Sequence, residues 1–95
     1  MNPLKYVVVT TKDRGVFGGY LADASKAPDQ VTLLQCRNCV HWSANVRGFL
    51  GLAVTGPLEG SRVGPAAPEV ALYDLTSVSV CSPEAVEAWE RAPWA

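Results

Sequence analysis

Residues 30–57 of the chain are QVTLLQCRNCVHWSANVRGFLGLAVTGP. The stretch holds two of the three cysteines, the only histidine and two of the five arginines. Its first part, residues 31–42, has the composition of a long strand, in which successive side chains point to opposite faces. The rest of the fold is predicted from this strand outward.

The two faces of that strand differ in polarity. The even-numbered face, which we expect to be buried, carries Thr32, Leu34, Cys36, Asn38, Val40 and Trp42. The odd-numbered face starts with Val31 and Leu33 and continues with Gln35, Arg37, Cys39 and His41. Any polar recognition by this strand is therefore expected on the odd-numbered face.

The segments before the strand predict a hairpin. Residues 4–11, LKYVVVTT, are rich in β-branched residues and indicate a buried strand. Residues 12–15 supply a turn, and residues 16–22 a second strand. Paired glycines at Gly18 and Gly19 indicate a bulge, a bend or the close approach of another backbone, with approach of a ligand as the functional alternative.

The segments after the strand predict two helices and further strand. Ser43 is a candidate cap for a short helix that ends before Gly56-Pro57, and residues 58–68 are expected to be a loop. Residues 70–81 indicate either one bent strand or two strands with a corner at Asp74. Ser82-Pro83 starts a helix that runs to about Arg91. A Trp at position 94 implies docking onto this chain or a neighbour.

The predicted fold class is mainly β with minor α. It is a small, bent antiparallel sheet or an SH3-like barrel of four to five strands, with a short middle helix and a C-terminal helix. A chain of 95 residues predicts a single domain, residues 1–95. Its 48% apolar and 18% charged residues are typical of a globular protein. Three Trp, three Tyr and two Phe in so short a chain predict a homo-oligomer.

The start of the chain has no signal-peptide pattern, and no apolar run approaches the roughly 18–20 residues that span a bilayer. An odd number of cysteines fits a reducing compartment. We therefore expect a soluble intracellular protein that does not bind membranes.

The net charge of −1 argues against a general nucleic-acid binder, which is usually strongly basic. The charge is unevenly distributed, because residues 30–68 contain three arginines against one acid, whereas residues 69–95 contain five acids against one arginine. The planar fork of Arg suits bidentate contact with phosphate or carboxylate. Solvated surface charge is the simpler explanation of the same pattern.

Two kinds of chemistry are considered and set aside. Cys36 and Cys39 form a C-x-x-C pair that, with His41 and Cys81, resembles a zinc ligand set, but residues three apart in a strand lie on opposite faces. We expect buried or partly buried thiols and no metal. No carboxylate between residues 29 and 59 is available to orient His41 beside Cys39, and phosphate-loop signatures are absent. We therefore expect no catalytic residues, no cofactor and no enzymatic activity.

The remaining constellation combines basic groups with aromatic rings. Arginine forks bind phosphate and aromatic faces stack bases, which is what an anionic nucleotide requires. The candidate ligand-binding residues are Arg37, His41, Trp42, Arg47, Arg62 and Tyr20. The simpler alternative for each aromatic residue is that it belongs to the hydrophobic core and binds no ligand.

Several motifs resemble a family of short bacteriophage proteins of unknown function. They are Gly15-Val16-Phe17-x-Gly19-Tyr20-Leu21, Arg37-x-x-x-x-Trp42, Leu52-Ala53 with Gly56, Pro68-x-Val70-x-Leu72 and the final Trp94. The chain departs from the family pattern at Cys39-Val40-His41, where family members are more aromatic and basic.

The resemblance implies a phage accessory protein in the host cytoplasm that acts by sequestration. The leading hypothesis is an oligomeric sponge that binds an anionic nucleotide immune signal of the host without cleaving it. The alternative hypothesis is a protein-protein interaction module that inhibits or modulates a host or phage protein.

Overall fold

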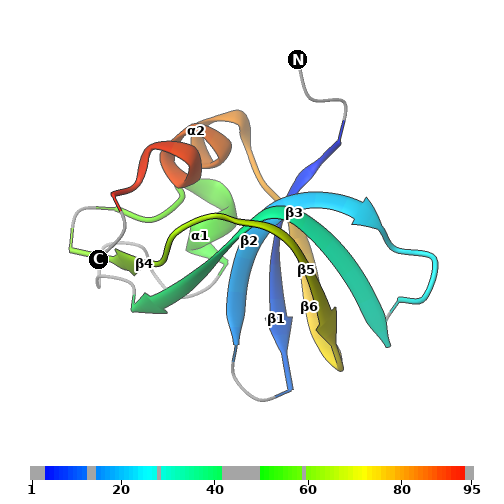
Figure 1. Ribbon diagram of the computed structural model, residues 1–95. Coiled ribbons are helices and arrows are strands. Elements are labelled where there is room, and N and C mark those ends of the chain that lie inside the picture. The colour runs from blue at the N-terminus through cyan, green and yellow to red at the C-terminus, as the bar shows by residue number, and fades with distance from the viewer. Residues whose placement is uncertain (1–3, 13–14, 28, 42–49, 59, 94–95) are drawn as a thin grey trace.

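The computed structural model describes residues 4–12, 15–27, 29–41, 50–58 and 60–93 (Figure 1). Its elements, in chain order, are β1 (Tyr6–Thr11), β2 (Val16–Asp23), β3 (Gln30–His41), α1 (Gly51–Val54), β4 (Arg62–Val63), β5 (Ala67–Tyr73), β6 (Leu75–Val80) and α2 (Pro83–Arg91). The mainly β class with two short helices confirms the prediction. No helix in the described part of the chain is long and apolar enough to cross a membrane.

All strand pairs in the sheet are antiparallel. The order is β4-β3-β2-β1-β6, and β5 also pairs with β3. The predicted long strand is thus the organising element, because β3 contacts β2, β4 and β5. Figure 1 shows α1 and α2 together at one side of the sheet, with the strands extending away from them.

The core is divided between the two faces of the sheet. On one face, which we call the helix-side core, Tyr6 and Val8 of β1 pack with α1 and α2. On the other face, the strand-side core, Val7 and Val9 pack with residues of β3 and β5. Both faces of β1 are therefore buried, which explains the unbroken apolar run in its sequence.

A bulge in β3 changes the predicted assignment of its faces. Gly18 pairs with Arg37 and Tyr20 pairs with Leu34, so that Gly19 alone lies opposite Gln35 and the residue after it. Gln35 takes a positive φ of 51°, which is uncommon for a residue other than glycine. The extra residue reverses the alternation of side chains beyond this point.

The predicted burial of the even-numbered face is confirmed at Cys36 but is wrong at the other described residues of that face. Val31 and Leu33 are 1% and 0% exposed and belong to the strand-side core, whereas Val40 is 63% exposed. Beyond the bulge Cys36 joins the strand-side core and Cys39 the helix-side core. Val31 and Leu33 precede the bulge and belong to the strand-side core, whereas Cys39 follows it and belongs to the helix-side core, so odd-numbered positions are buried on both sides of the bulge. The prediction assumed that only one face of the strand is covered, and the structure covers a different face in each half.

Both glycines of β2 lie at close approaches, and the predicted approach of another backbone is confirmed at Gly19, whereas Gly18 meets a side chain. A Cβ atom at Gly18 would lie 2.8–2.9 Å from ring atoms of Trp89. A Cβ atom at Gly19 would lie 3.0 Å from the backbone oxygen of Leu34 and 3.2 Å from the Cα of Cys36. The neighbours are a core tryptophan and the bulged strand, and both belong to the protein itself.

A corner at Asp74 divides residues 67–80 into two strands. Asp74 has a φ of 54°, and its backbone N–H donates to the oxygen of Asp29 at 3.0 Å. The corner confirms one of the two predicted alternatives. Among the described residues no pairing joins β5 to β6, so the sheet stays open and the SH3-like barrel alternative is wrong. The structure also adds β4 within the predicted loop of residues 58–68.

The final helix begins as predicted. The Ser82 side chain accepts a hydrogen bond from Ala85 N at 3.1 Å, and Pro83 occupies the first helical position. Its buried side chains are Ala85 and Trp89. The middle helix is only one turn, α1, and Ser43, its predicted cap, lies outside the described residues, as does Trp94.

Candidate functional site

Arg37 is buried, contrary to the expectation that its face of β3 would be exposed. The bulge at Gln35 turns the Arg37 side chain to the helix side of the sheet, where the residue is only 6% exposed. A guanidinium stays charged at any physiological pH, and a buried charge is costly unless polar atoms satisfy it. The partners of Arg37 therefore define this part of the molecule.

Two backbone carbonyls accept hydrogen bonds from Arg37. Its Nε donates to the oxygen of Gly64 at 2.7 Å, and Nη1 donates to the oxygen of Trp89 at 2.6 Å. Trp89 lies in the last turn of α2, where carbonyls lack partners within the helix and a cation is favourable. Arg37 thereby ties β3 to α2 and to the segment after β4.

The charge of Arg37 is not neutralised by a carboxylate among the described residues. The ion pair found in that part of the chain joins Arg91 and Glu87 on the surface of α2. The two carbonyl bonds use two of the five N–H donors of a guanidinium. The arrangement leaves a positive charge beside the cavity described next.

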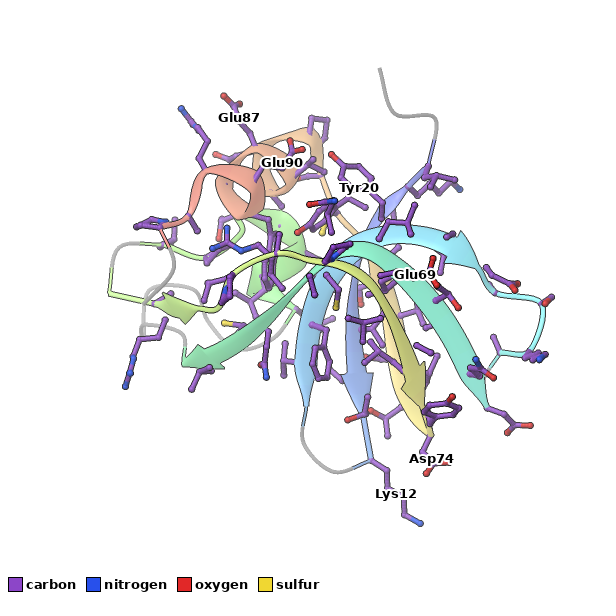
Figure 2. The ribbon with its side chains drawn as sticks, in the orientation of Figure 1. Lys12, Tyr20, Glu69, Asp74, Glu87 and Glu90 are labelled. Carbon is purple, nitrogen blue, oxygen red and sulfur yellow. The ribbon has the colours of Figure 1, made fainter. Side chains whose placement is uncertain are left out.

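Two tyrosines and Glu90 lie next to this arginine. The rings of Tyr6 and Tyr20 meet edge to face, with centroids 4.8 Å apart. Tyr20 donates from its hydroxyl to Oε2 of Glu90 at 2.6 Å, and Figure 2 shows the two side chains facing each other while Glu87 points away. Neighbouring strands supply the tyrosines and α2 supplies the acid.

The pKa values of both phenols are raised. The hydrogen bond to Glu90 is the largest cause for Tyr20, and it raises the pKa of that phenol to about 12. Burial raises the pKa of Tyr6 well above its ordinary value, while the charge of Arg37 acts in the opposite direction. Both hydroxyls keep their protons at neutral pH, and the proton of Tyr20 is already donated to Glu90.

These groups surround a cavity of about 160 Å³. It is open on one side, and its lining residues are Tyr6, Tyr20, Gln35, Arg37, Ala66 and Glu90. The site thus combines a buried cation, a carboxylate at the rim, two aromatic rings and an amide. Gln35 lines the cavity from the bulge. Its positive φ is a strained backbone conformation of the kind that clusters at functional sites.

The structure brings two of the six predicted ligand-binding residues together, Arg37 and Tyr20. Arg62 is exposed on β4, where it pairs through the backbone with His41, and it does not line the cavity. The side chain of His41, together with Trp42 and Arg47, lies outside what the structure describes.

Four lining residues were not predicted from the sequence. Tyr6 lies within an apolar run that predicts only a buried strand, and the acidic residues around Glu90 are typical of a solvent-exposed helix face. The spacing of Glu90 from Val86 was the available signal, because residues four apart lie on the same helix face and Val86 packs against the helix-side core. Gln35 lies on the strand face where polar recognition is expected but is not among the predicted candidates, and Ala66, one residue before β5, carries no signal.

The cysteines are placed as predicted for a strand. Cys36 belongs to the strand-side core and Cys39 to the helix-side core, so they lie on opposite faces of the sheet. Burial raises the pKa of Cys36 to about 11 and that of the half-buried Cys81 to about 12. The C-x-x-C spacing does not bring two thiolates together.

Comparison with known proteins adds the family. A model described as Domain of unknown function (DUF6948) matches residues 4–89. The chain belongs to this family. The DUF6948 match covers every strand and extends to Trp89, one residue short of Glu90 at the cavity. A search of curated proteins and a search of solved structures gave no match.

Membership of the DUF6948 family confirms one part of the sequence-based resemblance, namely a family of unknown function that covers nearly the whole chain. The bacteriophage origin stays a prediction.

Proposed function

We propose that this DUF6948 domain binds a small anionic ligand of the nucleotide class and does not turn it over. The observation that carries the proposal is the cavity in which Arg37 and Tyr20 meet. The buried guanidinium supplies positive charge for a phosphate or carboxylate, and the tyrosine rings supply an aromatic surface. With the phage resemblance, this supports a sponge for a host nucleotide signal in the host cytoplasm.

The size of the cavity restricts how such a ligand is held. An apolar cavity of about 150 Å³ holds a molecule of benzene size, and sites for drug-sized ligands measure about 300–1,000 Å³. A cavity of about 160 Å³ takes only one part of a nucleotide. The rest of the ligand lies over the open side of the cavity.

Glu90 adds a selectivity that the sequence did not predict. Its carboxylate repels a ligand that presents only negative charge, but it accepts hydrogen bonds from a hydroxyl or amino group. Nucleotides carry both an anionic phosphate and such donors. A ligand of this mixed type fits the pair of Arg37 and Glu90 better than inorganic phosphate does.

The reactive side chains near the site support binding without chemistry. Thiolates are the nucleophilic form of cysteine, and burial raises the thiol pKa values of Cys36 and Cys81 well above neutral pH. The phenol of Tyr20 also keeps its proton, because the hydrogen bond to Glu90 raises its pKa. None of these three groups is activated as a base or nucleophile.

The test is a thermal-shift screen with cyclic dinucleotides, cyclic trinucleotides and ADP-ribose derivatives, with inorganic phosphate as a comparison. A ligand present at 100 times its Kd stabilises the fold by about 2.7 kcal/mol, which is readily measured as a rise in Tm. Mass spectrometry of the ligand after incubation then shows whether it is recovered intact. Absence of a shift with every nucleotide, with co-purification of one protein, would favour the interaction-module alternative.

Two variants on α2 form a matched pair for this site. Glu90→Gln removes the negative charge at the cavity rim but keeps an oxygen that accepts hydrogen bonds, and we expect several-fold tighter binding of the anionic ligand. Glu87→Gln removes a charge whose side chain is 64% exposed and pairs with Arg91. Equal effects of the two substitutions on Kd would place the ligand elsewhere.

A further inference from the structure

β6 is an edge strand whose outer side is unpaired in the described structure. It pairs with β1 alone, from Val80 opposite Val7 to Leu75 opposite Thr11. The backbone N–H of Cys81 donates to the oxygen of Tyr6 at 2.9 Å. Because bonded positions alternate along an antiparallel pair, the backbone groups of Val78 and Val80 point away from β1.

The same two residues present apolar side chains. Val78 is 43% exposed and Val80 is 59% exposed. Their partners in β1 are Val9 and Val7, so these valines continue the strand-side core toward the open edge of the sheet. The apolar surface of the core therefore extends to an edge that no described strand covers.

The sequence of β6 lacks the usual protection of an edge. Residues 75–82 are LTSVSVCS, without a charged residue or a proline. Natural edge strands are commonly guarded by lysine, proline or an inward charge, because their free N–H and C=O groups accept another strand. β6 has neither a charge nor a proline, and its register shift opposite Thr10 and Thr11 places an irregularity at Thr76 alone, so residues 77–80 remain unguarded.

The surface along this edge is also hollowed. A cavity of about 150 Å³ is lined by four consecutive residues of β6, 75–78, and by Ala27 from the β2–β3 connection. A cavity that touches consecutive strand residues follows the strand edge and not one face of the sheet. It gives an approaching strand space beside the free backbone groups.

We propose that β6 pairs antiparallel with β6 of a second copy of this chain, joining two sheets in a two-fold dimer. An antiparallel pair of identical strands is self-complementary, as two-fold symmetry requires. Centred on Val78, it places the Val78 residues of the two copies opposite each other, which is a pair of β-branched residues of the kind that stabilises sheets. No like charges meet, because residues 75–82 carry none.

A second copy is favoured over a different protein because the strand matches itself in charge and pattern. The surface lies apart from the Arg37 cavity, since none of the residues that line that cavity belongs to β6. The dimer and the proposed ligand binding can therefore succeed or fail separately.

The test measures mass and backbone protection across protein concentration. We expect light scattering to give twice the chain mass of 10.1 kDa at high concentration and a return toward the monomer on dilution. Amide exchange at Val78 and Val80 should slow as the dimer forms. Val78→Lys should give a monomer, and Val80→Lys serves as the second variant if the first does not fold.

The matched control is Val54→Lys, which adds the same charge at an exposed apolar residue of α1, 61% exposed, and should leave the dimer intact. A wild-type monomer at every concentration would overturn the proposal, as would a folded Val78→Lys protein that still dimerises. Amide exchange in β6 of the purified protein that does not depend on its concentration would also contradict the proposal. That result is the one expected if β6 binds a different protein instead of a second copy.

Discussion

Substituting Gly18 by alanine tests the packing of α2 against the sheet. The added Cβ would lie 2.8–2.9 Å from Trp89 ring atoms, whereas ordinary contacts begin at 3.4 Å, so one side must move by about 0.6 Å (3.4 minus 2.8). Trp89 cannot yield easily. It is fully buried, its Nε1 donates to the oxygen of Leu52 at 2.9 Å, and its carbonyl accepts from Arg37.

The expected cost follows from these contacts. Overpacking a filled core costs about 1–3 kcal/mol, and the lower entropy of alanine in the unfolded chain returns about 0.4–1 kcal/mol. We expect a net loss of about 1–2 kcal/mol. In a domain of this size, 1 kcal/mol corresponds to a fall of about 4–8 °C in Tm.

Urea and thermal unfolding measure this loss, with Gly64→Ala as the control. A Cβ at Gly64 would meet its nearest atom, the oxygen of Asn38, at 3.8 Å, so that substitution should be close to neutral. A double-mutant cycle with Trp89→Phe should show a coupling of about 0.5 kcal/mol or more between positions 18 and 89. Equal Tm values for the two alanine variants would refute the reasoning.

The remaining predictions concern single groups. Arg37→Met leaves two carbonyl oxygens without their donor, and at about 1–3 kcal/mol for each buried unsatisfied group we expect a loss of about 2–6 kcal/mol in urea unfolding; a loss below 0.5 kcal/mol would contradict the described bonds. Ser82→Ala removes the α2 cap and should cost about 1 kcal/mol, with helix content by circular dichroism falling at a lower temperature. Folding raises the pKa of Cys36 to about 11, and those of Tyr20 and Cys81 to about 12, from 9.0 for the thiols and 10.0 for the phenol. The folded state therefore binds these protons more tightly, and its stability should be complete below pH 9 and fall as the pH rises toward 12. Unfolding midpoints in urea across this range check the sign, and a midpoint that rises with pH would be inconsistent with it.

Much of the fold was predictable because local chemistry and tertiary structure agree. The Ser82-Pro83 cap, the buried run of β1 and the Asp74 corner all have signals within a few residues. The assignment of faces in β3 was not predictable, because the bulge at Gln35 depends on its pairing with β2. One inserted residue places Arg37 and Cys39 on the opposite side of the sheet from Val31 and Leu33, and a separate core covers each side.

Only Arg37 and Tyr20 of the six lining residues of the candidate site were predicted, for the same reason. Arg37 and Tyr20 were identified as polar or aromatic residues within strands, but the burial of Arg37 comes from its carbonyl partners on segments far along the chain. Glu90 enters the site only when α2 docks on the sheet and meets Tyr20. Residue type gave the candidates, and long-range packing decided which of them meet.

The position of β1 in the sheet has a consequence for how the chain acquires its shape. Val8 of β1 pairs on one side with Gly18, which is close in sequence, and on the other side with Ser79, which is far along the chain. Pairing of residues so far apart in sequence must first overcome the entropy of closing a long loop. Proteins dominated by such contacts fold in milliseconds to seconds. Until β6 has been synthesised and has paired with β1, the valines of β1 are exposed to solvent and to other nascent chains. Low temperature and slow expression should therefore raise the yield of correctly folded material.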